Sequence, residues 1–152
     1  MTTGHVFIAT SLDGFVARQD HSLDWLHKQP VAEDDDGGFA AFMYSVDGLV
    51  MGTGSFRTLL GFGQWPYSKP VVVLSSSLTE QDIPEELKDK VRRSTAAPAD
   101  LMQELQEEGW TRAYIDGGRM VQSFLRQGLI ADLTITTVPI LIGTGLPLFG
   151  SL

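Results

Sequence analysis

The stretch IDGGRMVQSFLRQGLIADLTITTVPILIGTGLPLFG, from Ile115 to Gly150, decides the fold. A short apolar run ends at Asp116 and the glycine pair Gly117-Gly118, a helical pattern follows over 120–127, and a β-branched strand pattern returns over 132–138. Glycines between a strand and a helix expose backbone N–H groups at the positive end of the helix dipole, where a phosphate or diphosphate binds. The stretch therefore predicts a nucleotide-binding unit.

Length and composition narrow the class of protein. The 152 residues suffice for one domain, 1–152, with a sizeable core. The net charge of −8 argues against a nucleic-acid surface, which needs clustered positive charge, but a few local donors can still hold a small anionic ligand. No apolar run is long enough to span a membrane, and the N-terminus has no signal-peptide pattern. With no cysteine, the chain fits a reducing cytoplasm.

Strand and helix patterns alternate along the chain. Strands are expected at 6–10, 48–51, 70–74, 90–94, 112–115 and 132–138, and helices at 39–45, 55–60, 98–108 and 120–127. The segment from Val16 to about Val31 is expected to be irregular. This alternation predicts an α/β fold with a central, mostly parallel sheet covered by helices on both faces, a three-layer α/β/α arrangement.

Three of these strands end in small or hydroxylated residues. They lead into Gly52-Thr53-Gly54-Ser55, into Ser75-Ser76-Ser77, and into Asp116-Gly117-Gly118-Arg119. Small residues after one strand indicate only a tight turn. Three such ends at one edge of a sheet favour a dinucleotide crevice, because ligands bind outside the carboxyl ends of parallel strands. The Rossmann fingerprint is absent, since Arg57 stands where its third glycine would be, and this predicts a different fold.

The chain resembles the dihydrofolate reductase-like superfamily, and most closely the bacterial branch related to the C-terminal reductase domain of the bifunctional riboflavin-biosynthesis deaminase/reductase. The resemblance rests on IATSLDGFVA (8–17), VDGLVMGTGSF (46–56), PVVVLSSS (70–77) and the segment 114–150, in family order and spacing. It implies a three-layer fold and an NAD(P)H-dependent reductase that transfers a hydride to a pyrimidine-linked ribosylamine or a pterin-like substrate.

The resemblance also implies a cofactor site for NADPH, with NADH possible. The nicotinamide would lie beside Ala9 and the loop that contains Gly14, and the rest of the cofactor would lie across the three strand ends. The implied cofactor-binding residues are Ala9, Gly14, Gly52, Thr53, Gly54, Ser55, Leu74, Ser75, Ser76, Gly117, Gly118, Arg119, Met120 and Val121.

Two departures from the family pattern bear on these expectations. Thr53 stands where the family commonly has an arginine that faces the 2′-phosphate, so NADPH preference would need compensation by Arg57, Arg92 or Arg93. Family members usually continue beyond LPLFG with a further β-hairpin, whereas this sequence stops at Leu152. Either the sequence is cut short, or its last strand is missing and the sheet has an open edge. A partner subunit could cover that edge, and we expect a homodimer.

Hydride transfer usually needs a proton donor as well. Asp36 is the catalytic candidate, because it lies 16 residues before Gly52, the offset of the active-site carboxylate in dihydrofolate reductases. The alternative is that it belongs to an acidic helix N-terminus. Trp25, Asp116 and Thr136 are candidates for substrate binding; their alternatives are a core tryptophan, a cap of the glycine turn and an ordinary strand residue. Asp13 is expected to close a turn.

No metal site is expected. His5, His21 and His27 have no metal-ligand spacing and are predicted to lie at the surface. Two rival hypotheses stay open beside the reductase: a dinucleotide-binding or regulatory module without turnover, and a structural homodimer with a vestigial pocket.

Overall fold

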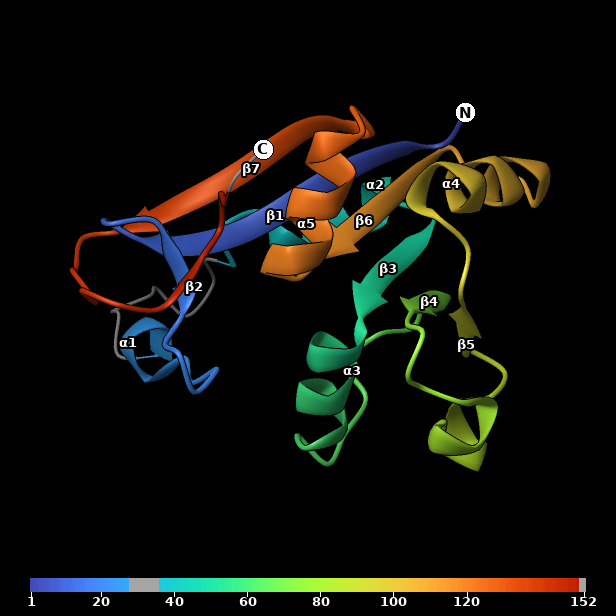
Figure 1. The fold of residues 1–152 in the computed structure, drawn as a ribbon, viewed down its shortest axis with the longest axis horizontal. Coiled ribbons are helices and arrows are strands. Elements are labelled where there is room, and N and C mark those ends of the chain that lie inside the picture. Colours follow the sequence, from blue (N-terminus) through green and yellow to red (C-terminus); the bar gives the residue numbers. More distant parts are fainter. Residues whose placement is uncertain (28–35, 151–152) are drawn as a thin grey trace.

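A six-stranded parallel sheet forms the centre of the molecule, with strand order β5-β4-β3-β6-β1-β7 (Figure 1). The computed structural model describes residues 1–27 and 36–150. The sheet strands are β1 (Thr3–Ser11), β3 (Gly48–Gly52), β4 (Val71–Leu74), β5 (Val91–Ser94), β6 (Arg112–Asp116) and β7 (Ile130–Val138). The helices are α1 (Asp24–His27), α2 (Phe39–Ser45), α3 (Thr53–Leu60), α4 (Pro98–Glu107) and α5 (Gly118–Arg126). Two 3₁₀ helices, η1 (Glu80–Asp82) and η2 (Glu85–Leu87), follow β4.

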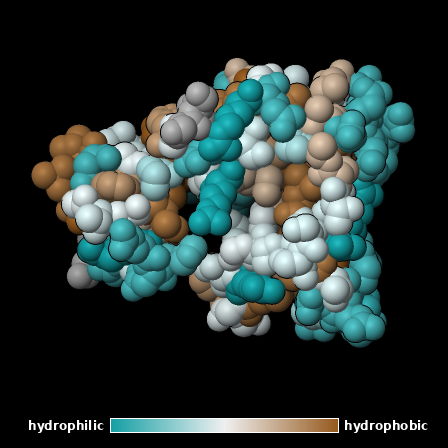
Figure 2. Space-filling model, in the orientation of Figure 1, coloured by the Kyte–Doolittle hydropathy of each residue, from teal (hydrophilic) through white to brown (hydrophobic). Residues whose placement is uncertain are grey.

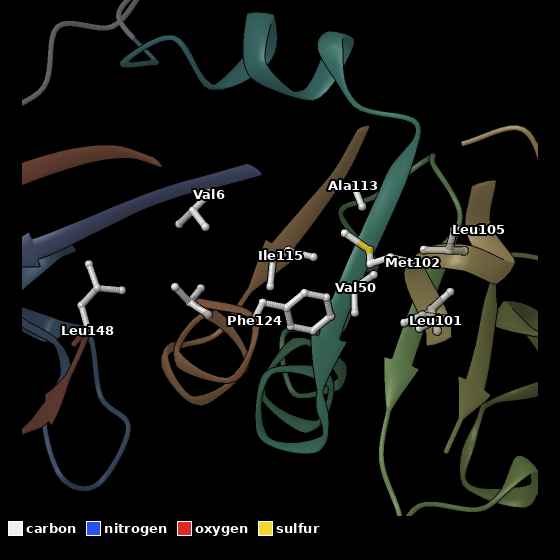
Figure 3. Close-up of a cluster of buried hydrophobic side chains, with 11 residues drawn as sticks. Val6, Val50, Leu101, Met102, Leu105, Ala113, Ile115, Phe124 and Leu148 are labelled. Atoms are coloured by element: carbon white, nitrogen blue, oxygen red, sulfur yellow. The ribbon is translucent and has the colours of Figure 1, made fainter. Parts of the chain in front are cut away.

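Each face of the sheet carries its own hydrophobic core. Side chains alternate along each strand, so Val50 and Ile115 face helices α4 and α5 while Leu49 and Met51 face α2, α3 and η2. The first core closes around Phe124 of α5 and Leu101 and Met102 of α4 (Figure 3). These two layers of helices confirm the three-layer α/β/α prediction.

The helix starts differ from the sequence prediction. Helix α5 begins at Gly118 instead of residue 120, and α3 begins at Thr53 instead of residue 55. Gly117 and Gly52 stand at the two N-cap positions, and neither helix has a side-chain cap. Both helices therefore start directly at the strand ends, and their first backbone N–H groups lie at the sheet edge.

The segment predicted as irregular contains two regular elements. Strand β2 (Phe15–Ala17) pairs antiparallel with β8 (Leu146–Pro147), and α1 follows it. The prediction failed here because β2 has only three residues and its partner lies about 130 residues away, so no local periodicity marks it.

Strand β7 departs from the expectation of a sheet covered on both faces. Among the residues that the structure describes, it is an outer strand that pairs with β1 alone, and Thr134, Ile135, Thr136 and Thr137 on it are all exposed. Within the part of the chain that the structure describes, no helix is long and apolar enough to cross a membrane.

Candidate functional site

The loops that follow β3 and β4 meet through a direct hydroxyl contact. Thr53 Oγ1 donates a hydrogen bond to Ser75 Oγ at 2.5 Å, and Ser75 Oγ accepts another from the Leu78 backbone N–H at 2.9 Å. Ser75 is only 8% exposed, whereas Ser76 beside it is exposed. The segments that follow β3 and β4 therefore lie side by side, as predicted.

The turn between β6 and α5 joins the same place. Gly117 has φ 98°, and a Cβ at this position would lie 2.7 Å from Ser55 Oγ of α3. A Cβ at Gly52 would lie 3.2 Å from Met120 Cε of α5. The positive φ and the close approach both exclude a side chain at Gly117. The backbone of this turn therefore lies directly against Ser55 of α3, and the three strand ends form one continuous wall.

Three backbone N–H groups lie in the first turn of α5, at the edge of the sheet. The N–H groups of Gly118, Arg119 and Met120 belong to its first turn and have no intrahelical acceptor. Val121 was predicted to take part, and this is corrected: its N–H donates to Gly117 O at 2.9 Å and its side chain is 0% exposed in the core. The Gly117 N–H donates to the Asp116 carboxylate.

The loop between β1 and β2 is fixed to the C-terminal segment beside α5. Ser11 Oγ donates to Asp13 at 2.6 Å, Asp13 accepts from Gly143 N–H at 2.8 Å, and Gly14 O accepts from Leu148 N–H at 3.0 Å. Asp13 thus closes the turn, as expected, and these hydrogen bonds hold its pKa below the ordinary value. A Cβ at Gly118 would lie 3.3 Å from Pro147 O, which places Gly14 and the tail beside the α5 N-terminus.

Hollows lie on the surface around this wall. The space-filling view shows one below the start of α5, between α3 and the segment that carries β2 (Figure 2). Another, of about 210 Å³, is lined by the predicted Leu74, Ser75, Ser76 and Met120 and by four residues that the sequence did not single out: Thr95, Ala96, Pro98 and Ser123. Thr95 and Ala96 directly follow β5, so the parallel order of the strands could have identified them.

No lysine or arginine lines that 210 Å³ hollow. Of the three arginines considered as compensation for Thr53, Arg92 is held by Glu108 in a two-bond fork of 2.7 and 2.6 Å. Arg93 pairs in register with Val73, which points toward the α2–α3 side of the sheet. Arg57 is exposed on α3, and its charge acts on Asp82.

Asp116 lies at the carboxyl end of β6 with little to stabilise its charge. It is paired in register with Met51, two residues after Tyr114 on the same face. Burial raises its pKa to about 6, against the opposing effect of the Gly117 N–H. Burial raises the pKa of the Tyr67 and Tyr114 phenols, and the charge of the nearby Asp116 raises both further.

Asp36, the predicted catalytic residue, has the opposite environment. It is exposed, and its carboxylate accepts hydrogen bonds from the Gly38 and Ala40 N–H groups, both at 2.9 Å, at the start of α2. These bonds hold its pKa below the ordinary value. The contacts are those of the alternative, a helix N-terminus, and the catalytic role stays a prediction.

The two other substrate candidates differ in their access to ligand. Trp25 is 2% exposed, which leaves almost no surface for contact. Thr136 is exposed on β7 and pairs in register with Ala9. Since paired residues of parallel strands point to the same face, Thr136 and Ala9 share the face on which Phe7 packs against Phe42.

The prediction that His5 is a surface residue was wrong. His5 is 2% exposed, its Nδ1 lies 3.0 Å from Asp132 Oδ1, and its Nε2 lies 2.8 Å from Thr3 Oγ1. The parallel pairing of β1 with β7 places Asp132 opposite it, a contact that sequence spacing does not reveal. In residues 1–27 and 36–150, no cluster of three or more His, Cys, Asp or Glu side chains could hold a metal ion.

Comparisons with known proteins agree with this architecture. A putative riboflavin biosynthesis protein from Shewanella sp. PV-4 has a solved structure with a TM-score of 0.93 and 47% identity, over 99% of this chain and 85% of that one. The uncharacterized protein YwjB of Bacillus subtilis is 27% identical over 97% of this chain and 82% of its own length.

A more distant relative shows the fold alone. The Thermotoga maritima diaminohydroxyphosphoribosylaminopyrimidine deaminase/5-amino-6-(5-phosphoribosylamino)uracil reductase matches with a TM-score of 0.68 at 14% identity, and this chain spans about half (47%) of it. The family model of the RibD C-terminal domain matches residues 2–152. The chain therefore belongs to the RibD C-terminal domain family, with a dihydrofolate reductase-like fold.

Proposed function

We propose that this protein is an NAD(P)H-dependent reductase that acts on a C=N bond of a pyrimidine-linked ribosylamine or a pterin-like molecule. The observation that carries the proposal is the single wall made by three strand ends, in which Thr53 contacts Ser75 and Ser55 closes against Gly117. The family membership and the fold support the same class of activity. When bound, the reduced nicotinamide would supply the hydride.

The residues of the wall fit a dinucleotide. The free N–H groups of Gly118, Arg119 and Met120 would bind the diphosphate at the α5 N-terminus. Gly52 and Gly54 leave the backbone of α3 open to close approach; a Cβ at Gly54 would meet nothing within 4 Å. The hydroxyls of Ser75, Ser76, Thr95 and Ser123 would bind ribose or phosphate oxygens in the adjacent hollow.

The charges around this wall favour little discrimination between NADPH and NADH. The lining of the 210 Å³ hollow has no cation, and Arg92 is already paired with Glu108. A 2′-phosphate gains most from an arginine fork. We therefore propose NADPH or NADH as cofactor, with a smaller preference for NADPH than an arginine at position 53 would give.

The substrate would lie on the sheet face shared by Ala9, Asp116 and Thr136. This face borders the aromatic side chains of Phe7 and Phe42, against which a flat heterocycle could stack. Trp25 would shape the site from the core and not as a direct contact, because it is buried.

Turnover separates the reductase from the binding module. The absorbance of NADPH and of NADH would be followed with a small panel of ribosylaminopyrimidines and dihydropterins. We expect substrate-dependent oxidation with at least one of them. Binding of a cofactor without oxidation against any panel member would instead support the non-catalytic module.

We further propose a homodimer, formed across the outer edge of β7, that works in the cytoplasm on a small-molecule substrate, without nucleic-acid or membrane partners. Its support is the exposure of Thr134 to Thr137 on a strand that, among the described residues, is paired along one edge alone.

A further inference from the structure

A second hollow, of about 280 Å³, lies at the opposite end of the sheet from the proposed cofactor wall. It is larger than the 210 Å³ hollow beside that wall. Strands β4 and β5 contribute their amino ends to the larger hollow and their carboxyl ends to the smaller one. The lining includes Lys88, Asp89, Lys90, Arg92, Glu108 and Trp110. The larger hollow therefore belongs neither to the cofactor wall nor to the proposed substrate face.

Trp110 forms a fixed, flat wall of this hollow. Its backbone N–H donates to Leu105 O at 2.9 Å, and its carbonyl oxygen accepts a hydrogen bond from Thr2 Oγ1 at 2.8 Å. Its ring covers Gly48, where an added Cβ would overlap it, and the residue is only partly buried. An aromatic surface that is already held in place loses little freedom when the ring of a ligand packs against it.

Two of the basic side chains in the lining already have acidic partners. Arg92 is held by Glu108 in the two-bond fork, and Lys88 Nζ lies 3.0 Å from Glu85 Oε1. A further acidic residue, Glu104, also acts on Arg92. Because these pairs leave no surplus of positive charge, the hollow does not favour a plain anion such as phosphate.

Asp89 and Lys90 keep opposite charges that no partner neutralises. Among the residues that the structure describes, neither takes part in a salt bridge, and both are exposed. A ligand with one negative and one positive group would pair with both side chains. An ion of a single sign would instead meet a like charge beside its partner.

We propose that this hollow binds a small zwitterion with one flat ring, of which an aromatic α-amino acid is the simplest example. The ring packs against Trp110, the carboxylate pairs with Lys90, and the ammonium group pairs with Asp89. A volume of 280 Å³ lies just below that of drug-sized pockets, about 300–1,000 Å³, and suits a molecule of this size. The site does not depend on the proposed reductase activity, because it lies at the other end of the strands.

Binding can be followed on the tryptophan side chains, of which the protein has three. In ¹⁵N-labelled protein, the indole N–H signal that disappears in Trp110→Phe, which keeps an aromatic ring over Gly48, belongs to Trp110. Phenylalanine would be titrated beside two analogues of nearly the same shape: 3-phenylpropionate, which lacks the ammonium group, and 2-phenylethylamine, which lacks the carboxylate. Phenylalanine should shift the Trp110 signal with a Kd of roughly 1–10 mM, the range of a fragment of this size, and leave the signal of the buried Trp25 in place. Each analogue should bind about fivefold more weakly, because it loses one exposed ion pair.

Substitutions of exposed side chains separate the two charge contacts. Lys90→Gln should weaken the binding of phenylalanine and 3-phenylpropionate about fivefold and leave that of 2-phenylethylamine unchanged, and Asp89→Asn should weaken phenylalanine and 2-phenylethylamine instead. Lys88→Gln is the matched control and should bind all three like wild type, since that lysine already pairs with Glu85. The proposal is overturned if phenylalanine at about 50 mM leaves the Trp110 signal unmoved or if either analogue binds as tightly as phenylalanine. It is also overturned if Lys90→Gln or Asp89→Asn binds phenylalanine as tightly as Lys88→Gln does.

Discussion

Asp36 and Asp116 have opposite environments, and this difference organises the site at the scale of single residues. Asp36 is exposed and accepts two backbone hydrogen bonds at the start of α2, which favour its charged form. Asp116 is partly buried, and this burial raises its pKa and favours its neutral form. The sequence singled out Asp36 as the catalytic candidate and Asp116 as a substrate-binding candidate. It could not show their environments, because helix capping and burial come from backbone and tertiary contacts that spacing does not show.

Substitution of Asp116 by Asn is expected to stabilise the protein as pH rises. The folded-state pKa is raised to about 6, so the folded state binds more protons than the unfolded state between about pH 4 and 6. The free energy of unfolding of the wild type therefore falls as pH rises through that window and is level above it. Asp116→Asn lacks the carboxyl group and should not show this fall. The gain should reach on the order of 2 kcal/mol above pH 6 in urea unfolding. Equal stability differences at pH 4 and pH 7 would show that the carboxyl is not desolvated.

Substitution of Asp36 by Ala should have the opposite pH dependence. Because the folded-state pKa is lowered, the charged carboxylate stabilises the folded protein above the unfolded-state pKa. That contribution is lost as pH falls through the lower, folded-state pKa. Thermal melts should therefore show Asp36→Ala less stable than wild type at pH 7 and nearly equal to it below about pH 3. A loss of the same size at both pH values would contradict a role through the ionised carboxylate.

At the scale of elements, the strand ends and helix starts determine what can bind. Strand periodicity and the glycine pairs allowed the sheet, its parallel direction and the three loops to be predicted from sequence. The start of α5 was placed two residues late, because glycines at 117 and 118 carry no helical pattern. Val121 was counted as a donor from the family resemblance, but its N–H already donates to Gly117 O.

Gly48, at the start of β3, is expected to tolerate no side chain. An added Cβ would lie 2.7 Å from Pro70 O and would overlap the Trp110 ring, which covers it. Gly48→Ala should therefore cost about 1–3 kcal/mol of unfolding free energy in urea denaturation. The matched control is Gly54→Ala, where the added Cβ meets nothing within 4 Å. If Gly48→Ala were as stable as its control, the close approach of Trp110 to β3 would be wrong.

At the scale of the whole molecule, the outer edge of β7 is the feature that the sequence predicted in outline. Six of its nine residues are β-branched, and its single charged side chain, Asp132, is held by His5 of β1. Edge strands are commonly protected by lysine, proline or a bulge on the edge. Strand β7 carries neither lysine nor proline, and its register with β1 shifts at its start, between Ile130 and Asp132, before the exposed residues 134–137. A two-fold antiparallel pairing of β7 with its copy about Thr134 would place Asp132 opposite Thr136, without like charges in contact.

The exposed edge of β7 predicts a dimer, and one added charge at the centre of that edge should dissociate it. Sedimentation should show wild type as a dimer at micromolar concentration, and Thr134→Lys, at the two-fold centre, as a monomer, because two lysines would face each other there. Thr58→Lys, on the exposed surface of α3, serves as the control and should stay dimeric. A monomeric wild type, or a Thr134→Lys variant that remains dimeric, would exclude this interface.

The central claim is that the three strand ends hold a nicotinamide dinucleotide, and cofactor-dependent stability tests it most directly. A ligand that binds only the folded state stabilises it by RT ln(1 + [L]/Kd), about 2.7 kcal/mol at 100 times Kd. Thermal unfolding would be followed with NADPH, with NADH and without either. Two variants would be compared: Gly54→Leu, which fills the approach to α3, and the exposed-site control Ala41→Leu. We predict a rise in Tm for wild type and Ala41→Leu with at least one cofactor and none for Gly54→Leu; no rise in wild type with either cofactor at millimolar concentration would contradict the account.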